Sequence, residues 1–242
     1  GFPTFVKLSV KDLSKVEEVV LNGAECEPYI TADTLTMTDR ADDIFEGIQL
    51  LEKYLGVKKV IIGIEDNKPQ SIKAMQELSK KDSAIVVKPM PAAYPQGGEK
   101  VLIYNTTGKT VPEGKLPLDV GCIVMNVTSV ATLYRFITTG MPLVSKRITV
   151  DGTAVTEPKN LLVPIGTPIK EILDFVGVDM ENVDRVLMGG PMMGNPVVSC
   201  ESVLEKRNNA ILAMRDKKPQ PQTACIRCGR CADTCPMSLY PA

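Results

Sequence analysis

The sequence predicts an α/β domain built on a parallel sheet, then a small α+β module, then a short cysteine-rich segment. Two β-branched runs of strand length, residues 57–64 and 84–88, enclose a helical pattern, which is typical of a βαβ unit with parallel strands. After residue 141 the pattern changes to strand, strand, helix and strand, which indicates a separate module. Four of the seven cysteines lie between Cys225 and Cys235.

The elements of the first domain follow in order from local patterns. Residues 16–22 read as a strand that runs into a loop. Residues 40–54 are expected to form a helix, because apolar residues recur at helical spacing from Ile44 to Tyr54. The remaining expected elements are a strand at 57–64, a helix at 69–80, a strand at 84–88, a Pro- and Gly-rich loop at 89–98 before a helix, and a helix at 129–139.

The second module is expected to begin with strands at 147–151 and 161–164. A short helix at 166–176 follows, with Thr167 as its N-cap and Pro168 at its first position. A third strand is expected at 184–188, and residues 192–214 contain two more possible short strands. Residues 217–222 form a polar, proline-containing linker to the cysteines.

Composition excludes several classes of function. The chain has no histidine, which rules out histidine triads, histidine metal ligands and a histidine general base. The net charge is −1, so the chain has no basic field to bind nucleic acid. No apolar run reaches the roughly 18–20 residues of a membrane helix, so we expect no membrane span. Hydrophobic and charged contents of 44% and 24% are ordinary for a globular protein.

The cysteine segment matches the pattern C-x2-C-x2-C-x3-C-P, formed by Cys225, Cys228, Cys231, Cys235 and Pro236. This is the bacterial ferredoxin run, in which three thiolates hold one [4Fe–4S] cluster and the fourth ligates another. A zinc site would more often show two separated C-x2-C pairs, and a disulfide framework is disfavoured without a secretory signal. The run occurs only once, so we expect an incomplete cluster set. Cys26, Cys122 and Cys200 read as small buried residues.

Several other segments resemble one known family, the flavin subunits of respiratory complex I. Residues 1–8 (GFPTFVKL) resemble the end of its glycine-rich flavin loop. Residues 22–28 (NGAECEP), 94–100 (YPQGGEK) and 128–133 (TSVATL) resemble its N-A-D-E-x-E-P, Y-I-C-G-E-E-T and N-N-V-E-T-L segments. Together with MGGPMMG and CIRCGRCADTCP, they are similar to a narrower branch, the C subunits of Rnf electron-transport complexes. The resemblance covers nearly the whole chain.

The resemblance implies an FMN- and NAD-binding α/β domain with a parallel sheet, a β-grasp module of the soluble-ligand-binding type, and a partial ferredoxin-like segment. We expect these at residues 1–142, 143–199 and 223–242, with return strands and a linker at 200–222. Because the family's flavin loop lies mostly before Gly1 and its second cysteine run is missing here, we expect this stretch to be inactive by itself.

The resemblance also implies roles for single residues. Phe2 would stack on the adenine of NAD, and Lys7 would contact FMN. Asn22 would bond the flavin ring edge, while Glu25 and Glu27 would accept bonds from NAD. The other implied FMN contacts are Gly97, Gly98, Glu99, Ser129 and Thr132. The alternatives stay open: a solvated acidic loop at 25–27, and an ordinary turn before a helix at 97–98.

The function implied is that of an electron-transfer subunit of a ferredoxin:NAD oxidoreductase. Hydride would pass between NAD(H) and FMN, and single electrons through two [4Fe–4S] clusters, with ion transport by partner subunits. Ferredoxin would be an indirect partner, and the subunit would lie peripherally on the cytoplasmic side of the bacterial membrane. The alternatives are a related cobalamin reductase of a diol-utilisation microcompartment and a non-catalytic docking subunit. The loop 188–194 reads as packing between domains or, less readily, as a cofactor loop.

Overall fold

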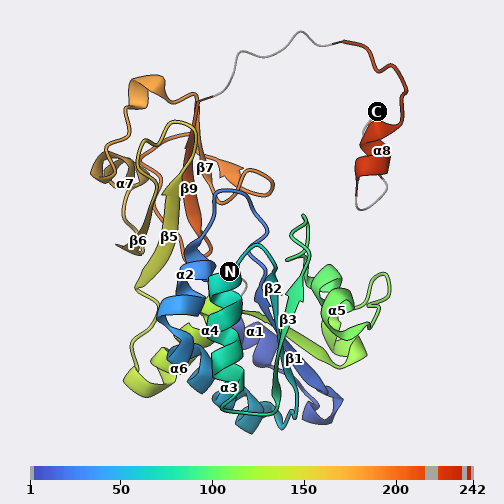
Figure 1. Cartoon of the computed structure of the whole chain (residues 1–242). Coiled ribbons are helices and arrows are strands. Elements are labelled where there is room, and N and C mark those ends of the chain that lie inside the picture. The colour runs from blue at the N-terminus through green and yellow to red at the C-terminus, as the bar shows by residue number, and fades with distance from the viewer. Residues whose placement is uncertain (1–2, 216–222, 236–238, 241–242) are drawn as a thin grey trace.

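The computed structural model describes residues 3–215, 223–235 and 239–240 and shows two sheets, each with its own core (Figure 1). Phe2, the linker at 217–222 and Pro236 lie outside the described residues. The helices are α1 (Thr4–Leu8), α2 (Ala32–Asp39), α3 (Ala41–Leu55), α4 (Pro69–Ser79), α5 (Glu99–Thr107), α6 (Val127–Thr139), α7 (Ile169–Phe175) and α8 (Arg230–Thr234). The strands are β1 (Glu18–Gly23), β2 (Val60–Glu65), β3 (Ile85–Met90), β4 (Cys122–Asn126), β5 (Ser145–Asp151), β6 (Lys159–Pro164), β7 (Arg185–Met188), β8 (Asn195–Pro196) and β9 (Ala210–Met214).

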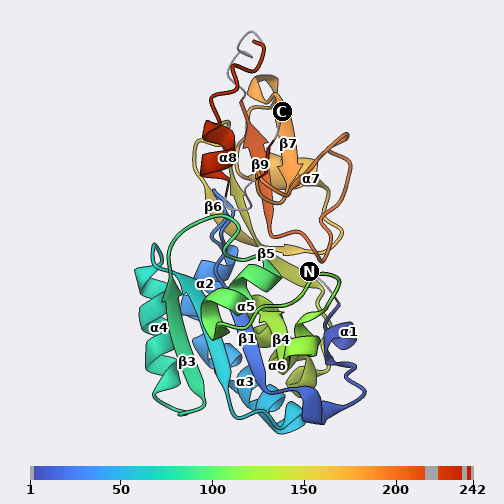
Figure 2. The ribbon, with the colours of Figure 1, turned by 90° about the vertical axis from the view of Figure 1, so that its right-hand side faces the viewer.

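The first sheet is parallel throughout, with strand order β3-β2-β1-β4. Because side chains alternate along a strand, Val19 and Leu21 of β1 face the core shared with α2, α3, α4 and α6, whereas Val20 faces the core beneath α5. The sheet is therefore covered on both faces, as parallel sheets require (Figure 2).

The sequence predictions for this domain are confirmed in outline. The strands expected at 16–22, 57–64 and 84–88 correspond to β1, β2 and β3, and the four expected helices to α3, α4, α5 and α6. The bounds differ by a few residues, as is usual at element ends. The helices α1 and α2 and the strand β4 were not expected from the sequence.

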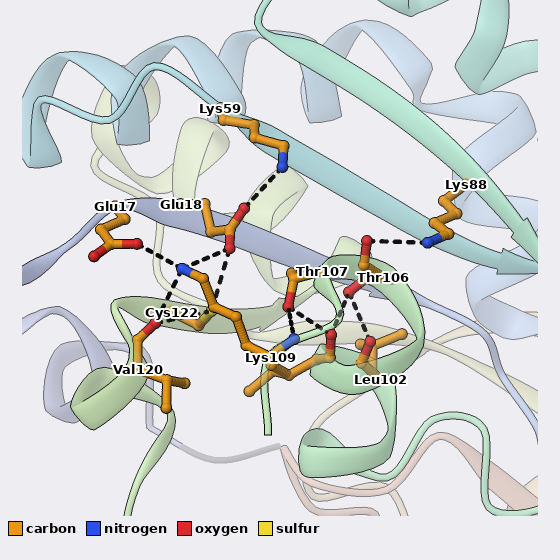
Figure 3. A network of polar contacts seen from close by, with 11 residues as sticks. Glu17, Glu18, Lys59, Lys88, Leu102, Thr106, Thr107, Lys109, Val120 and Cys122 are labelled. Carbon is orange, nitrogen blue, oxygen red and sulfur yellow. Dashed lines mark hydrogen bonds and ion pairs between the residues drawn. The ribbon is translucent and has the colours of Figure 1, made fainter. Parts of the chain in front are cut away.

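A network of charged groups holds the amino end of the sheet together, opposite to the end where the strands finish (Figure 3). The Lys109 ammonium lies 2.6 Å from Glu17 and 2.9 Å from the nearly buried Glu18, which Lys59 also contacts at 3.1 Å. Burial alone would raise the pKa of Glu18, but the bonds from Lys109 and Lys59 outweigh it and lower that pKa. Burial also raises the pKa of the adjacent Cys122 thiol to about 11. This end of the sheet is a closed structural network.

The second module is a mixed five-stranded sheet of order β6-β5-β9-β7-β8, with α7 packed against it. The strands expected at 147–151, 161–164 and 184–188 correspond to β5, β6 and β7, and the two short strands expected within 192–214 are β8 and β9. The capping prediction for α7 is wrong. The helix begins at Ile169 with Pro168 as its N-cap, because the Thr167 hydroxyl donates backwards to the Pro164 carbonyl at 2.9 Å.

The two modules meet where the loop after β1 and α2 reach β5 and β6. The Thr31 amide donates to the Thr149 hydroxyl at 3.0 Å, and the Asn160 amide donates to the Thr31 hydroxyl at 2.8 Å. Arg147 of β5 forms an ion pair with Asp39 of α2 at 3.1 Å. The second module therefore stands directly over the carboxyl ends of the first sheet's strands (Figure 2).

The third part, residues 223–235, contains the short helix α8 and lies apart from both sheets (Figure 1). Among the residues that the structure describes, each helix is too short or too polar to cross a membrane.

Candidate functional site

The candidate site lies at the carboxyl ends of β1 and β4, where the order of the strands reverses. The chain passes from β1 to β2 on one side, while β4 lies on the other side of β1. Asn22, near the end of β1, is paired in register with Asn126 at the end of β4. Open α/β sheets bind their ligands at such a switch point.

Lys7 and Glu99 meet at this edge, although 92 positions separate them in the sequence. The Lys7 ammonium donates to the Glu99 carboxylate at 2.7 Å and to the Val124 carbonyl of β4 at 2.8 Å. A cation and a carboxylate, both partly exposed, are thus held beside Val124, near the carboxyl end of β4. The structure brings together these two residues that the sequence proposed for one site.

Asn22 and Gly97 form a second contact between predicted residues. The Asn22 side-chain amide donates to the Gly97 carbonyl at 2.9 Å, and the Gly97 amide donates to the Cys26 thiol at 3.3 Å. A Cβ added at Gly97 would lie 3.2 Å from that sulfur, and one at Gly98 would lie 3.0 Å from the Pro95 carbonyl. The loop therefore approaches the sheet edge as bare backbone. Such a cradle fits the face of a flat ring such as the flavin of FMN.

Glu25 serves the fold at the start of α2. Its carboxylate accepts bonds from the Asp33 amide at 2.7 Å, the Thr34 amide at 2.9 Å and the Thr34 hydroxyl at 2.6 Å. Burial, and then the charge of Asp33, raise the pKa of Glu25 to about 7. The alternative of a solvated acidic loop does not describe Glu25, because this carboxylate orders the loop and occupies the α2 N-terminus.

Glu27 reaches the second module. One of its oxygens accepts a bond from the Met192 amide at 2.9 Å, and the other is buried without a hydrogen-bond partner among the described residues. A Cβ at Gly190 would collide with this carboxylate, so the loop 188–194 needs glycine there to pack against Glu27. These contacts support the interpretation of that loop as packing between domains, and they leave one carboxylate oxygen for a ligand.

Ser129 and Thr132 lie in the first turns of α6. The Asn126 side chain caps this helix, accepting from the Thr128 amide at 2.9 Å and the Ser129 amide at 3.2 Å. Ser129 and Thr132 line a cavity of about 460 Å³ between the modules. Gly97 and Lys7 do not line this cavity, so Ser129 and Thr132 form a second group of the predicted site.

Sequence reasoning missed the residues that connect these groups. Asp33 accepts bonds from the Asn126 amide and the Thr128 hydroxyl, both at 2.6 Å, while its own backbone amide donates to Glu25. An asparagine between an apolar run and a helix is an N-cap signal, and it could have identified Asn126 together with β4. Nothing in local sequence links Asp33 to that cap.

A larger cavity, of about 680 Å³, lies over the ends of β1, β2 and β3. Its walls include Glu27, Tyr94 and the ion pair between Lys68 and Glu65, whose charged groups are 2.9 Å apart. The cavity adjoins the Asn22–Gly97 contact through Cys26, which lines it. The polar edge thus has room for a ligand of nucleotide size beside the loop of Gly97 and Gly98.

The cysteine segment presents thiols without an enclosing fold. Cys225, Cys228 and Cys231 are exposed and Cys235 is half-buried. The Arg227 amide donates to the Cys225 sulfur at 3.4 Å. Within the described ranges, no three Cys, His, Asp or Glu side chains converge into a group that could hold a metal ion. The donors suit an iron–sulfur cluster by their chemistry, since soft thiolates are its ligands, but the fold does not prearrange them.

Comparisons with known families give two matches in this chain. Residues 1–135 match the model of the Nuo51 FMN-binding domain, and residues 147–196 match that of the SLBB domain. These matches coincide with the parallel sheet and with most of the mixed sheet.

Curated relatives cover the whole chain. Over its full length the chain is 42% identical to the C subunit of the proton-translocating ferredoxin:NAD(+) oxidoreductase complex of Clostridium ljungdahlii, of which it covers 53%. It is 42% identical to the C subunit of the ion-translocating oxidoreductase complex of Pseudomonas aeruginosa, over 100% of this chain and 31% of the relative. The Na(+)-translocating counterpart of Acetobacterium woodii is 40% identical over 99% of this chain, which covers 55% of it. The chain thus spans between a third and about half of these relatives.

Among solved structures, an NAD+-reducing [NiFe]-hydrogenase has a similar fold. In its air-oxidised state the TM-score is 0.69 at 18% identity, over 88% of this chain and 43% of the hydrogenase chain. In its H2-reduced state the TM-score is 0.72 with the same identity and coverage.

Proposed function

The chain belongs to the Nuo51 FMN-binding family, in the branch of the C subunits of ion-translocating oxidoreductase complexes, and from this we propose that it is the FMN- and NAD(H)-binding part of such a subunit. It would exchange hydride between NAD(H) and FMN, and single electrons through [4Fe–4S] clusters. Other subunits of the complex would couple this electron transfer to ion transport. The division into residues 1–142, 143–199, 200–222 and 223–242 remains part of the proposal.

The observation that carries this proposal is the meeting of three distant segments at one sheet edge. Lys7 contacts Glu99, and Asn22 contacts Gly97, at the strand ends where α/β sheets bind nucleotides. Nothing in core packing requires a lysine, a carboxylate and a bare glycine loop in that place. A flavin ring lying over the loop would account for all of them.

FMN supplies, when bound, the conversion between hydride transfer and single-electron transfer. Asn22 would hydrogen-bond the ring edge, and the thin backbone of Gly97 and Gly98 would let the ring approach the sheet. The Lys7 cation would favour the reduced, more negative flavin, with Glu99 setting its position. No side chain has to move a proton, which agrees with the absence of histidine.

Cys225, Cys228, Cys231 and Cys235 would hold iron–sulfur clusters, with further ligands from outside this run. Partners would be the membrane and flavoprotein subunits of the complex, with ferredoxin reached indirectly. A peripheral position on the cytoplasmic face of the bacterial membrane is the location proposed.

Flavin fluorescence tests this proposal. When FMN is titrated with the full-length polypeptide, the fluorescence of the flavin should be quenched. Addition of NADH should then bleach the visible absorbance of the bound flavin. Lys7→Met should weaken FMN binding by about tenfold, since a charge-assisted contact is lost. Lys58→Met, at an exposed lysine before β2, is the matched control and should change nothing.

Absence of both quenching and bleaching in the wild type would contradict the proposal and favour a non-catalytic docking role. NADH-dependent reduction of cobalamin by the wild type would favour the cobalamin reductase instead.

A further inference from the structure

Cys26 is the middle one of three consecutive residues that reach three different parts of the molecule. The Glu25 carboxylate bonds to the start of α2, and the Glu27 carboxylate accepts a bond from the amide of Met192 in the second module. Between them, the Cys26 thiol accepts a bond from the amide of Gly97, in the loop before α5. From its sequence, Cys26 was expected to be a small buried residue. The structure instead shows a half-buried side chain in contact with the glycine loop.

The backbone just before Cys26 is held in an unusual conformation. Glu25 has a φ of 48°, in the left-handed region that residues other than glycine rarely adopt. Three bonds, from the Asp33 amide and from the amide and hydroxyl of Thr34, fix its side chain. Such conformations persist where the surrounding structure enforces them, and they are concentrated at functional sites. The turn that precedes Cys26 is therefore held in place independently of its contact with Gly97.

Both peptide groups that flank Gly97 are fixed by side chains from β1 and the loop after it. The Gly97 amide donates to the Cys26 sulfur at 3.3 Å, and the Gly97 carbonyl accepts from the Asn22 amide at 2.9 Å. The preceding part of the loop is tied instead to the end of β2, where the Ala93 amide donates to Glu65 at 3.3 Å. The position of Gly97 relative to β1 therefore depends on Asn22 and Cys26.

The Cys26 thiol is a neutral acceptor. Burial raises its pKa, and the charges of Glu65 and Glu27 act in the same direction, whereas the bond from Gly97 opposes them. Because an ordinary cysteine titrates near about pH 8.5, this thiol stays protonated at neutral pH. Its sulfur is a weak acceptor that adds no negative charge beside the loop. Cys26 also lines the cavity of about 680 Å³ over the strand ends, so it lies at the border between the loop and open space.

We propose that Cys26 is a positioning residue for FMN, which fixes, through the Gly97 amide, the loop over which the flavin ring lies. The inference rests on the proposed function, because it assumes that FMN binds over this loop. It assigns a role to a side chain that the resemblance to flavin subunits leaves without one. Since Cys26 acts on the ring, and riboflavin has the same ring without the phosphate, the two flavins should depend on Cys26 equally.

The test titrates the full-length polypeptide with FMN and follows both the fluorescence quenching and the visible absorption band of the bound flavin. Cys26→Ala removes the acceptor of the Gly97 amide. It should weaken FMN binding by about 3- to 10-fold, the effect of one neutral hydrogen bond, and shift the absorption band. Cys26→Ser keeps an acceptor, so it should restore the wild-type band and most of the affinity. Riboflavin should lose affinity by the same factor as FMN in Cys26→Ala.

Alkylation tests whether the flavin lies beside Cys26. FMN bound over Gly97 should slow the reaction of Cys26 with N-ethylmaleimide, measured by mass spectrometry of the modified peptide. Cys200 is the matched control, because it is also half-buried but packs beside the core of the second module. Its alkylation should not respond to FMN, and Cys200→Ala should keep the FMN affinity and the absorption band of the wild type.

Unchanged FMN affinity in Cys26→Ala would overturn the inference, and so would equal losses in Cys26→Ala and Cys26→Ser. A lower thermal unfolding midpoint of Cys26→Ala with an unchanged flavin band would show a structural role and would overturn it as well. Alkylation of Cys26 that bound FMN does not slow would place the flavin elsewhere, with the same consequence. These outcomes leave the proposed function intact, whereas a wild type that binds no FMN overturns the proposed function itself.

Discussion

The edge of the parallel sheet and the cysteine segment are both candidate cofactor regions, yet they are built in opposite ways. At the sheet edge, side chains from α1, β1, α2, the loop before α5 and the start of α6 are already bonded to one another. In the cysteine segment, three of the four thiols are exposed on a single short stretch of chain.

The two regions therefore differ in what determines the geometry of the site. The sheet edge takes its shape from packed cores on both faces of the sheet, so the shape exists without a ligand. The cysteines must take theirs from the cluster, because binding of a metal group and local folding are coupled when the fold does not prearrange the ligands. Variants in each region test whether the cysteine segment and the packed sheets are independent of each other.

The largest effect is expected in the cysteine segment. In the full-length polypeptide, Cys228→Ala should remove about half of the iron taken up on anaerobic reconstitution, because the run supplies three ligands to one of the two expected clusters and that cluster loses one of them. The thermal unfolding midpoint of the two sheets should shift by less than about 1 °C, since the exposed residue packs against neither. Iron and sulfide analysis and circular dichroism measure the two quantities.

Cys200→Ala is the matched control, because Cys200 packs beside the core of the second module. It should keep iron incorporation and lower the unfolding midpoint. Normal iron content in Cys228→Ala, or a large decrease in its thermal unfolding midpoint, would contradict the independence of the cysteine segment from the two sheets.

An intermediate effect is expected at the sheet edge. Asn126→Ala removes the N-cap of α6 and the bond to Asp33, and should lower the free energy of unfolding by about 1–2 kcal/mol. It should weaken FMN binding at the same time and leave iron incorporation unchanged. Urea denaturation and flavin titration measure these effects. The exposed Asn182→Ala of the second module is the control, and a loss at Asn126 no larger than at Asn182 would contradict the prediction.

The sequence predicted those parts of the fold whose signal is local. The β-branched runs of β2 and β3 and the apolar spacing of α3 and α4 are such signals. The strand β4 was missed because its five residues, CIVMN, carry no period and gain their structure from pairing with β1. The helix α2 was missed because its sequence, ADTLTMTD, is rich in residues of low helix propensity.

The residues of the candidate site also fall into two groups, those that the sequence could propose and those that only the structure shows. The resemblance to the flavin subunits of respiratory complex I was enough to propose Lys7, Asn22, Gly97 and Glu99, and the structure shows the contacts of Lys7 with Glu99 and of Asn22 with Gly97. No local rule connects Glu25 with a helix that starts seven residues later, or Asp33 with the cap of α6 more than ninety residues away. Such links arise only when the sheet brings strand ends together.

The smallest effect is a pH dependence inside the packed domain, at Glu52 of α3. Burial, and then the charge of Asp82, raise the pKa of Glu52 to about 7, and Gln49 donates to both carboxylates at 2.8 and 2.7 Å. A glutamate in the unfolded chain titrates near about pH 4.3, so the folded state holds this proton more tightly. The stability due to the proton is complete below about pH 4 and is lost as the pH rises to about 7.

Glu52→Gln, which cannot ionise, should therefore raise the free energy of unfolding at about pH 8 and change it little at about pH 4.5. The gain should be at most about 1 kcal/mol, because Glu52 is half-buried and solvent screens part of its charge. Urea denaturation across this pH range measures it, with the exposed Glu46→Gln of the same helix as control. Parallel pH curves for wild type and Glu52→Gln would rule out this titration. Because the effect depends on packing of α3 against the loop before β3, it should persist in Cys228→Ala, where the cluster is lost.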